Sequence, residues 1–117
     1  MAMFFCLVLL LHFVGDFLCQ TRQMANNKSS NNYWLAAHVT VYSFVLFLGL
    51  IYFFDIRNLI LFVIANFFLH FITDKITSQF TSYFYKKNNL YGFFSIVGFD
   101  QFIHNSTLIL LTEFILL

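Results

Sequence analysis

The chain has 117 residues, of which 61% are hydrophobic and only 9% are charged. Soluble domains usually carry about 25% charged residues, so this chain has too little polar surface to enclose a core in water. Two cysteines are too few for a disulfide scaffold, and a net charge of +1 gives no basic field that would attract nucleic acid. The composition leaves one small integral membrane domain, residues 1–117, as the expected class.

Four apolar runs predict four membrane helices. In chain order, the runs cover residues 2–19, 33–54, 59–73 and 93–117. Residues 20–32 form a polar loop by composition, and residues 74–89 are polar and aromatic, which indicates an interfacial segment. We therefore expect an all-α fold, an integral membrane four-helix bundle with an interfacial helix between the third and fourth helices.

The basic residues predict an orientation. With four spans, loops 20–32 and 74–92 lie on one side of the membrane and Arg57 lies on the other. The two loops hold all the other basic residues of the chain: Arg22, Lys28, Lys75, Lys86 and Lys87. The positive-inside rule then predicts that these loops are cytoplasmic and that both termini are outside.

Ionisable residues are concentrated inside the predicted spans. An aspartate at a helix centre costs roughly 2.5–3.5 kcal/mol on insertion scales, so such groups normally face a bundle interior. The set comprises all four histidines and three aspartates: His12, His38, His70, His104, Asp16, Asp74 and Asp100. We expect these seven residues to face one another and to form a site.

Spacing and depth support this expectation. Three histidine–aspartate pairs are four residues apart, which puts both members on one helix face. The pairs are His12 with Asp16, His70 with Asp74, and Asp100 with His104. His38 has Tyr42 four residues on, which predicts an orienting hydroxyl for this ring. All seven residues also fall in the predicted cytoplasmic half of the bundle.

A short internal repeat relates the two halves of the chain. Residues 11–16 (LHFVGD) match residues 69–74 (LHFITD), and each copy is followed by a helix with a further histidine. Two pseudo-repeated helical hairpins would be related by an axis along the membrane normal. A site between such hairpins would take residues from both.

Imidazoles together with carboxylates are ligands for Zn²⁺ or another divalent first-row metal, such as Mn²⁺ or Fe²⁺. The first ligands we expect are His12, Asp16, His70 and Asp74. His38, Asp100 and His104 either complete the coordination shell or act as catalytic acid and base. More candidates exist than one closed zinc site needs, which leaves room for an open metal position or for two metals that share carboxylates. This chemistry suits a metal-dependent hydrolase that acts on a lipid or its head group.

The expected partners are membrane lipids and a second copy of the chain. Lys28 and Lys75 flank the predicted site and could hold an anionic head group, with Gln20 and Gln101 as further substrate-binding candidates. The alternatives are a buried hydrogen-bond network without metal, an oligomeric ion or proton pathway in a phage or defence effector, and an interaction module that uses the 20–32 loop.

The ordered motifs resemble DUF family 3307, which comprises small prokaryotic and phage membrane proteins of unassigned function. The resemblance rests on a set of spaced elements that cover nearly the whole chain: His12-x3-Asp16-Phe17-Leu18-x-Gln20, Lys28, His38, His70-x3-Asp74-Lys75 and Asp100-Gln101-x2-His104. It implies a location in the prokaryotic inner membrane. More distantly, the pattern is similar to the membrane-bound metal-dependent hydrolases, although their His-rich zinc signature is absent here.

Overall fold

The computed structural model describes residues 1–117 and contains helices and turns without any strand. This confirms the all-α prediction. The elements are α1 (Ala2–Phe13), the π-helical turn η1 (Val14–Leu18), α2 (Arg22–Asn27), α3 (Asn32–Leu50), α4 (Ile56–Lys86), α5 (Leu90–Leu111) and a second π-helical turn, η2 (Thr112–Leu116).

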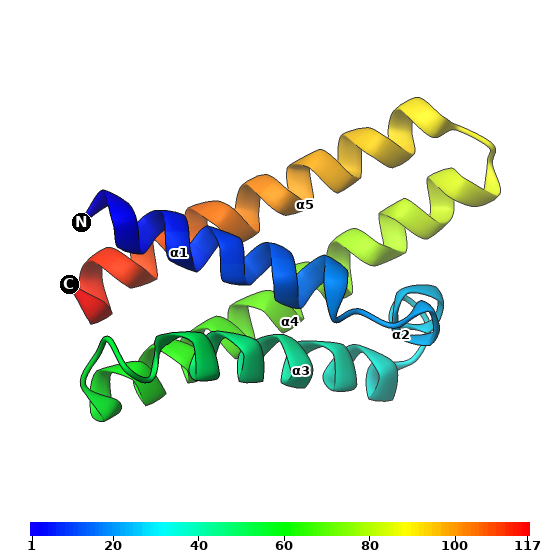
Figure 1. The fold of residues 1–117 in the computed structure, drawn as a ribbon. Coiled ribbons are helices and arrows are strands. Elements are labelled where there is room, and N and C mark those ends of the chain that lie inside the picture. Colours follow the sequence, from blue (N-terminus) through cyan, green and yellow to red (C-terminus); the bar gives the residue numbers. More distant parts are fainter.

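Four long helical segments run side by side, and successive segments point in opposite directions (Figure 1). Both termini and the α3–α4 turn lie at one end of the molecule, whereas α2 and the α4–α5 turn lie toward the other. The α4–α5 hairpin extends beyond the ends of α1 and α3, so its outer part stands next to α2 (Figure 1).

Side-chain caps determine where the helices start. The side chains of Thr21, Asn31, Asp55 and Asn89 each accept a backbone N–H bond from the first turn of the helix that follows. These oxygens satisfy amide groups that have no partner inside the helix. Between α4 and α5, Asn88 adopts a positive φ of 53°, a conformation that asparagine tolerates and that ends a helix.

The structure corrects two of the predicted boundaries. We expected a helix to end at residue 73 and an interfacial segment to follow, but α4 continues unbroken from Ile56 to Lys86. Hydropathy falls after residue 73, but no glycine or proline interrupts the helix there, so the fall does not mark a helix end. The loop 20–32 contains the short helix α2, and α3 ends at Leu50, four residues earlier than predicted.

The apolar core occupies the end of the molecule that carries the termini. Its buried members come from α1, α3, α4 and α5: Val8, Tyr42, Leu46, Leu50, Leu59, Phe62 and Leu108. Along each of these four helices, the core residues lie on the terminus side of the histidines. The packed core therefore lies between the histidines and the end of the molecule that carries the termini.

Two helices, α3 and α4, are long and apolar enough to cross a membrane by length and composition. The apolar segment Ala2–Leu18 is shorter. These helices are weak evidence on their own, because buried core helices of soluble proteins meet the same criteria.

Candidate metal centre

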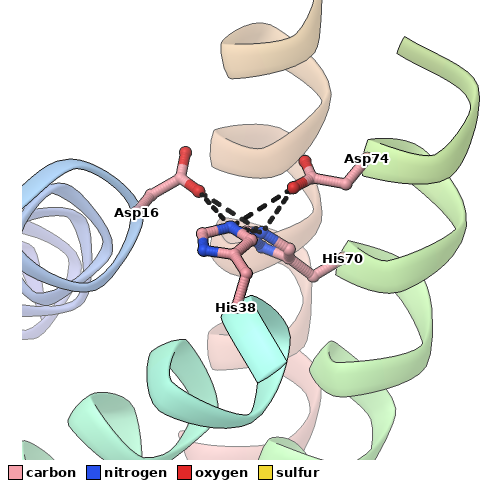
Figure 2. Close-up of side chains that lie close together, drawn as sticks. All are labelled: Asp16, His38, His70 and Asp74. Carbon is pink, nitrogen blue, oxygen red and sulfur yellow. Dashed lines mark hydrogen bonds and ion pairs between the residues drawn. The ribbon is translucent and has the colours of Figure 1, made fainter. Parts of the chain in front are cut away.

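Four side chains from three helical segments point at a common position (Figure 2). Asp16 comes from η1, His38 from α3, and His70 and Asp74 from α4. The Nε2 atom of His38 lies 3.1 Å from Asp16 Oδ1 and 3.2 Å from Asp74 Oδ2. The Nε2 atom of His70 lies 3.4 Å and 3.5 Å from the same two oxygens. We call these four residues the four-donor group.

The four-donor group is buried and has one donor atom from each residue. All four residues are buried, and the donor atoms lie within 4.8 Å of one another. The two Nε2 atoms are 3.3 Å apart, and the Nδ1 atoms of His38 and His70 have no hydrogen-bond partner. The polar contacts of both rings are thus concentrated on the Nε2 side, where the carboxylates converge.

Local backbone structure brings Asp16 into this group. Gly15 packs directly against α3, where a Cβ atom on residue 15 would lie 2.8 Å from Tyr42 Cδ2 and 3.3 Å from its Cα. Asp16 itself lies in the π-helical turn η1. Turns of this type place side chains off the regular α-helical register and often occur at functional sites.

Asp74 also belongs to a second, adjoining group of donors. Its other oxygen, Oδ1, lies 2.9 Å from His104 Nε2, and Asp100 Oδ1 lies 3.3 Å from the same nitrogen. Thr77 donates a hydrogen bond from its hydroxyl to Asp100 Oδ1. Asp74, Asp100 and His104 thus form a three-donor group that shares Asp74 with the four-donor group.

His12 lies outside both groups. Its Nδ1 atom is 3.1 Å from the Tyr42 hydroxyl and its Nε2 atom is 2.9 Å from Gln101 Oε1, whereas Asp16 Oδ2 is 3.8 Å away. The Gln101 amide donates to Asp16 at 2.9 Å and to Asp100 at 3.1 Å. We expected Tyr42 to orient His38, but its hydroxyl contacts His12 instead. Gln101 links the carboxylates of Asp16 and Asp100.

The structure brings all seven predicted residues into one connected network, because each lies within 4 Å of at least one other member. The three pairs predicted from four-residue spacing are all present, with separations of 3.8, 3.5 and 3.3 Å. The assignment of metal-binding and catalytic roles within this network stays a prediction.

Lys28 is the cation of the site, and it comes from the segment between α2 and α3. Its Nζ atom lies 3.0 Å from Asp74 Oδ2. Burial alone would lower the pKa of the ammonium, but attraction to Asp74 and Asp16 and the hydrogen bond to Asp74 outweigh this, so its pKa is raised. Lys75, the other predicted head-group ligand, is exposed and does not line the site.

A cavity of about 600 Å³ opens beside the network at the end that carries α2. Asp16, Asp100 and Lys28 form part of its wall. Its other residues include both predicted glutamines, a set of α4 hydroxyls and several apolar side chains: Gln20, Gln101, Thr77, Ser78, Thr81, Ser82, Phe17, Phe93 and Val97. Two buried oxygens, Gln20 Oε1 and Ser78 Oγ, have no hydrogen-bond partner.

The sequence reasoning missed the α4 hydroxyls. Thr77, Ser78, Thr81 and Ser82 follow a spacing that puts them on one side of a helix. This spacing indicates a shared helix face, but the prediction of an interfacial segment over residues 74–89 separated the four hydroxyls from Asp74. A continuous α4 makes them neighbours of the candidate metal centre.

The fold and the site together define a small all-helical protein with a buried histidine–carboxylate network beside a polar cavity. The chain belongs to the family described as "Protein of unknown function (DUF3307)", whose model matches residues 4–117. This confirms the resemblance drawn from the spaced motifs, while the more distant likeness to membrane-bound hydrolases stays a prediction. No curated protein and no solved structure matches the chain.

Proposed function

We propose that this protein is a membrane-embedded, divalent-metal-dependent hydrolase that acts on a phosphoester in a lipid head group. The observation that carries the proposal is the geometry of the four-donor group. Two imidazole nitrogens and two carboxylate oxygens converge there within 4.8 Å, and one wall of a solvent-accessible cavity is formed by Asp16, a member of the group.

The separations of the donor atoms support a metal. A tetrahedral zinc ion with bonds of about 2.0–2.1 Å holds its ligand atoms about 3.3 Å apart. The five donor separations measured between His38, His70 and the two carboxylates range from 3.1 to 3.5 Å. Zn²⁺ suits this mixture of nitrogen and oxygen donors, with Mn²⁺ or Fe²⁺ as alternatives.

Charge supports it as well. Asp16, Asp74 and Asp100 bring three negative charges into one network, and Lys28 supplies one positive charge beside them. Buried carboxylates without compensation are costly, and normally they are paired or bound to metal. With neutral histidines, the form that binds metal, one divalent ion would balance the charges of this network.

The outer surface suits a bilayer. Large apolar side chains project outward from the three longest helices, including Phe44 on α3, Phe68 on α4 and Phe102 on α5, with exposed fractions of 61%, 61% and 66%. A soluble monomer rarely exposes such a surface, whereas lipid tails would cover it. Together with the two long apolar helices, this favours insertion of the chain into a membrane, which we propose is the prokaryotic inner membrane.

The position of the basic residues favours a cytoplasmic cavity. Arg22 and Lys28 lie in or next to α2, and Lys86 and Lys87 lie at the end of α4, so the positive charge gathers at the end of the molecule that carries the cavity. By the positive-inside rule, that end faces the cytoplasm and both termini face outward.

The cavity suits a phosphorylated head group attached to an apolar chain. Lys28, Lys86 and the α4 hydroxyls offer positive charge and hydrogen-bond donors to phosphate oxygens. The unpartnered Ser78 hydroxyl, on a residue only 6% exposed, is a donor that such a ligand would satisfy. Phe17, Phe93 and Val97 give the same cavity an apolar side along which acyl carbons can lie.

The reaction is addition of water across a phosphoester bond. A bound metal lowers the pKa of water and polarises the phosphoryl oxygen. The water oxygen forms a bond to phosphorus, the bond between phosphorus and the leaving alcohol breaks, and the alkoxide takes up the proton that the water releases. Asp100 lines the cavity, and His104 lies behind it with its Nε2 atom 3.3 Å from Asp100 Oδ1; these two residues position the water and transfer its proton, while Lys28 holds the anionic substrate.

The apolar core argues against the alternative of an ion pathway through one chain. Its seven buried members fill the bundle between the histidines and the terminus end, and Leu46, Leu50, Leu59 and Phe62 are fully buried. A polar route across the bundle would have to pass through these side chains, whereas a hydrolase needs access from one side only.

The test is metal analysis of detergent-purified protein, followed by a lipid assay. We expect about one or more equivalents of metal in the wild type and loss of metal in Asp74→Asn, whereas Asp55→Asn, a matched change in an exposed cap at the far end, keeps it. Mixed micelles of phosphatidic acid or phosphatidylglycerol then give new ³¹P resonances only with metal-loaded protein. Folded wild type that binds no added metal overturns the metal centre, and metal-loaded protein without product overturns the hydrolase.

A further inference from the structure

The two oxygens of Asp74 have different neighbours. Oδ2 faces the four-donor group, at 3.2 Å from His38 Nε2 and 3.5 Å from His70 Nε2. Oδ1 faces away from it, at 2.9 Å from His104 Nε2. A carboxylate that serves two donor sets in this way has the geometry of a bridging ligand between two cations.

The set on the Oδ1 side has the composition of an open metal position. Asp74, Asp100 and His104 each offer one donor atom, and these atoms lie within 4.8 Å of one another. Catalytic metal sites typically have three protein ligands and keep a further position for water, whereas sites with four protein ligands are closed. The four-donor group is of the closed type, so a reactive water would have to enter it as a fifth ligand.

Access distinguishes the two groups in the same sense. Apart from the shared Asp74, each group has one member that lines the cavity: the side chain of Asp16 is 6% exposed, whereas that of Asp100 is 14% exposed. The three-donor group is therefore the one that a substrate in the cavity reaches first.

The internal repeat gives a separate reason for two cation positions. Asp16 in residues 11–16 corresponds to Asp74 in residues 69–74, and each repeat is followed by a helix with one further histidine. In the structure, Asp16 pairs with His38 at 3.1 Å and Asp74 pairs with His104 at 2.9 Å. Each half of the chain thus supplies an equivalent carboxylate–imidazole pair, one in each donor group.

We propose that Asp74, Asp100 and His104 bind a second divalent cation, joined to the first through the Asp74 carboxylate, and that this second ion carries the reactive water. The inference rests on the proposed function, because it assigns the first ion to the four-donor group. Paired catalytic metals are typically about 3.5–4 Å apart, a span that one carboxylate bridges. Asp100 and His104 would then act on the water as ligands of the ion that carries it.

Charge predicts that the two ions bind unequally. With neutral histidines, the form that binds metal, three carboxylates and Lys28 give the network two negative charges, which the first divalent ion would balance. A second ion adds two positive charges, and an anion in the cavity would offset them. The second ion should therefore bind more weakly than the first, and inorganic phosphate should strengthen its binding.

The experiment is a titration of metal-free wild type with Mn²⁺, read by equilibrium dialysis and by electron paramagnetic resonance. We expect two ions per chain, the second with an affinity that rises at least several-fold in the presence of inorganic phosphate, and a spin-coupled signal when both are bound. Asp100→Asn should bind one ion with an uncoupled signal, whereas Asp55→Asn should behave as wild type. His104→Gln is the second variant, in case one substitution alone impairs folding.

The outcomes separate this inference from the proposal on which it rests. Saturation of the wild type at one uncoupled ion per chain overturns the second site and leaves a single-metal hydrolase open to the lipid assay. Two coupled ions without any hydrolysis of the lipids support the second site but contradict the hydrolase. A second ion that survives in both Asp100→Asn and His104→Gln refutes the assignment of its ligands.

Discussion

Substitution of Gly15 by alanine tests whether the close approach of η1 and α3 builds the metal centre. The added Cβ would lie 2.8 Å from Tyr42 Cδ2 and 3.3 Å from Tyr42 Cα. Ordinary carbon–carbon contacts are about 3.5–4.0 Å, so one of the two elements must move by roughly 0.7–1.2 Å. Tyr42 is fully buried and packs on the His70 ring with centroids 4.1 Å apart, so it cannot turn away freely.

The consequence for the site follows from this displacement. If η1 moves away from α3, the 3.1 Å separation of Asp16 Oδ1 from His38 Nε2 grows by a comparable amount. Metal–ligand distances tolerate only about 0.2 Å of variation, so the affinity of the four-donor group for metal falls. Overpacking of this kind typically costs about 1–3 kcal/mol of stability.

The matched control is Gly98→Ala in α5, where an added Cβ meets no atom within 4 Å. Both variants gain the helix propensity of alanine, which is worth about 0.5–1 kcal/mol, so their difference isolates the clash. We expect Gly15→Ala to unfold with about 1–3 kcal/mol less free energy than Gly98→Ala and to retain less metal at equal free metal concentration. Equal stability and equal metal content in the two variants would refute the reasoning.

Three further predictions concern the surroundings of the site. Tyr42→Phe leaves His12 Nδ1 without its 3.1 Å partner, so we expect a loss of about 1–3 kcal/mol in unfolding free energy at unchanged metal content; metal loss would show that the hydroxyl has a role in binding. Leu46→Ala opens a cavity in the fully buried core and should cost about 2–5 kcal/mol without changing the stoichiometry of bound metal, measured after refolding checks by circular dichroism; a smaller loss would indicate that the core collapses around it. Removal of metal by a chelator should lower the midpoint temperature of unfolding, because a free ion concentration of 100 times the dissociation constant stabilises the fold by about 2.7 kcal/mol. An unchanged midpoint temperature would argue against a bound metal.

Much of the site could be predicted from the sequence because long apolar helical segments place strong constraints on ionisable residues. An aspartate in an apolar segment has few acceptable surroundings, so the three histidine–aspartate spacings and the common depth led to residues that lie in one network. The helical class followed from the apolar runs for the same reason. Neither inference required knowledge of how the helices pack.

The details that packing decides could not be predicted. His12 matches His70 in the repeat, yet its ring turns to Tyr42 and Gln101, because partners from α3 and α5 compete with Asp16 for it. Hydropathy placed the end of the third helix at residue 73, although α4 continues to Lys86. Sequence spacing describes neighbours on one helix, whereas contacts between helices depend on rotations that spacing does not encode.

The spread of the donors along the chain has a consequence for folding during synthesis. Asp16, His38, Asp74 and His104 come from four successive helical segments, so a growing chain that ends before α5 contains an incomplete network. Until α5 is present, Asp74 lacks its 2.9 Å contact with His104 Nε2. Assembly of the network is thereby coupled to completion of the chain, because a copy that ends before α5 lacks both Asp100 and His104.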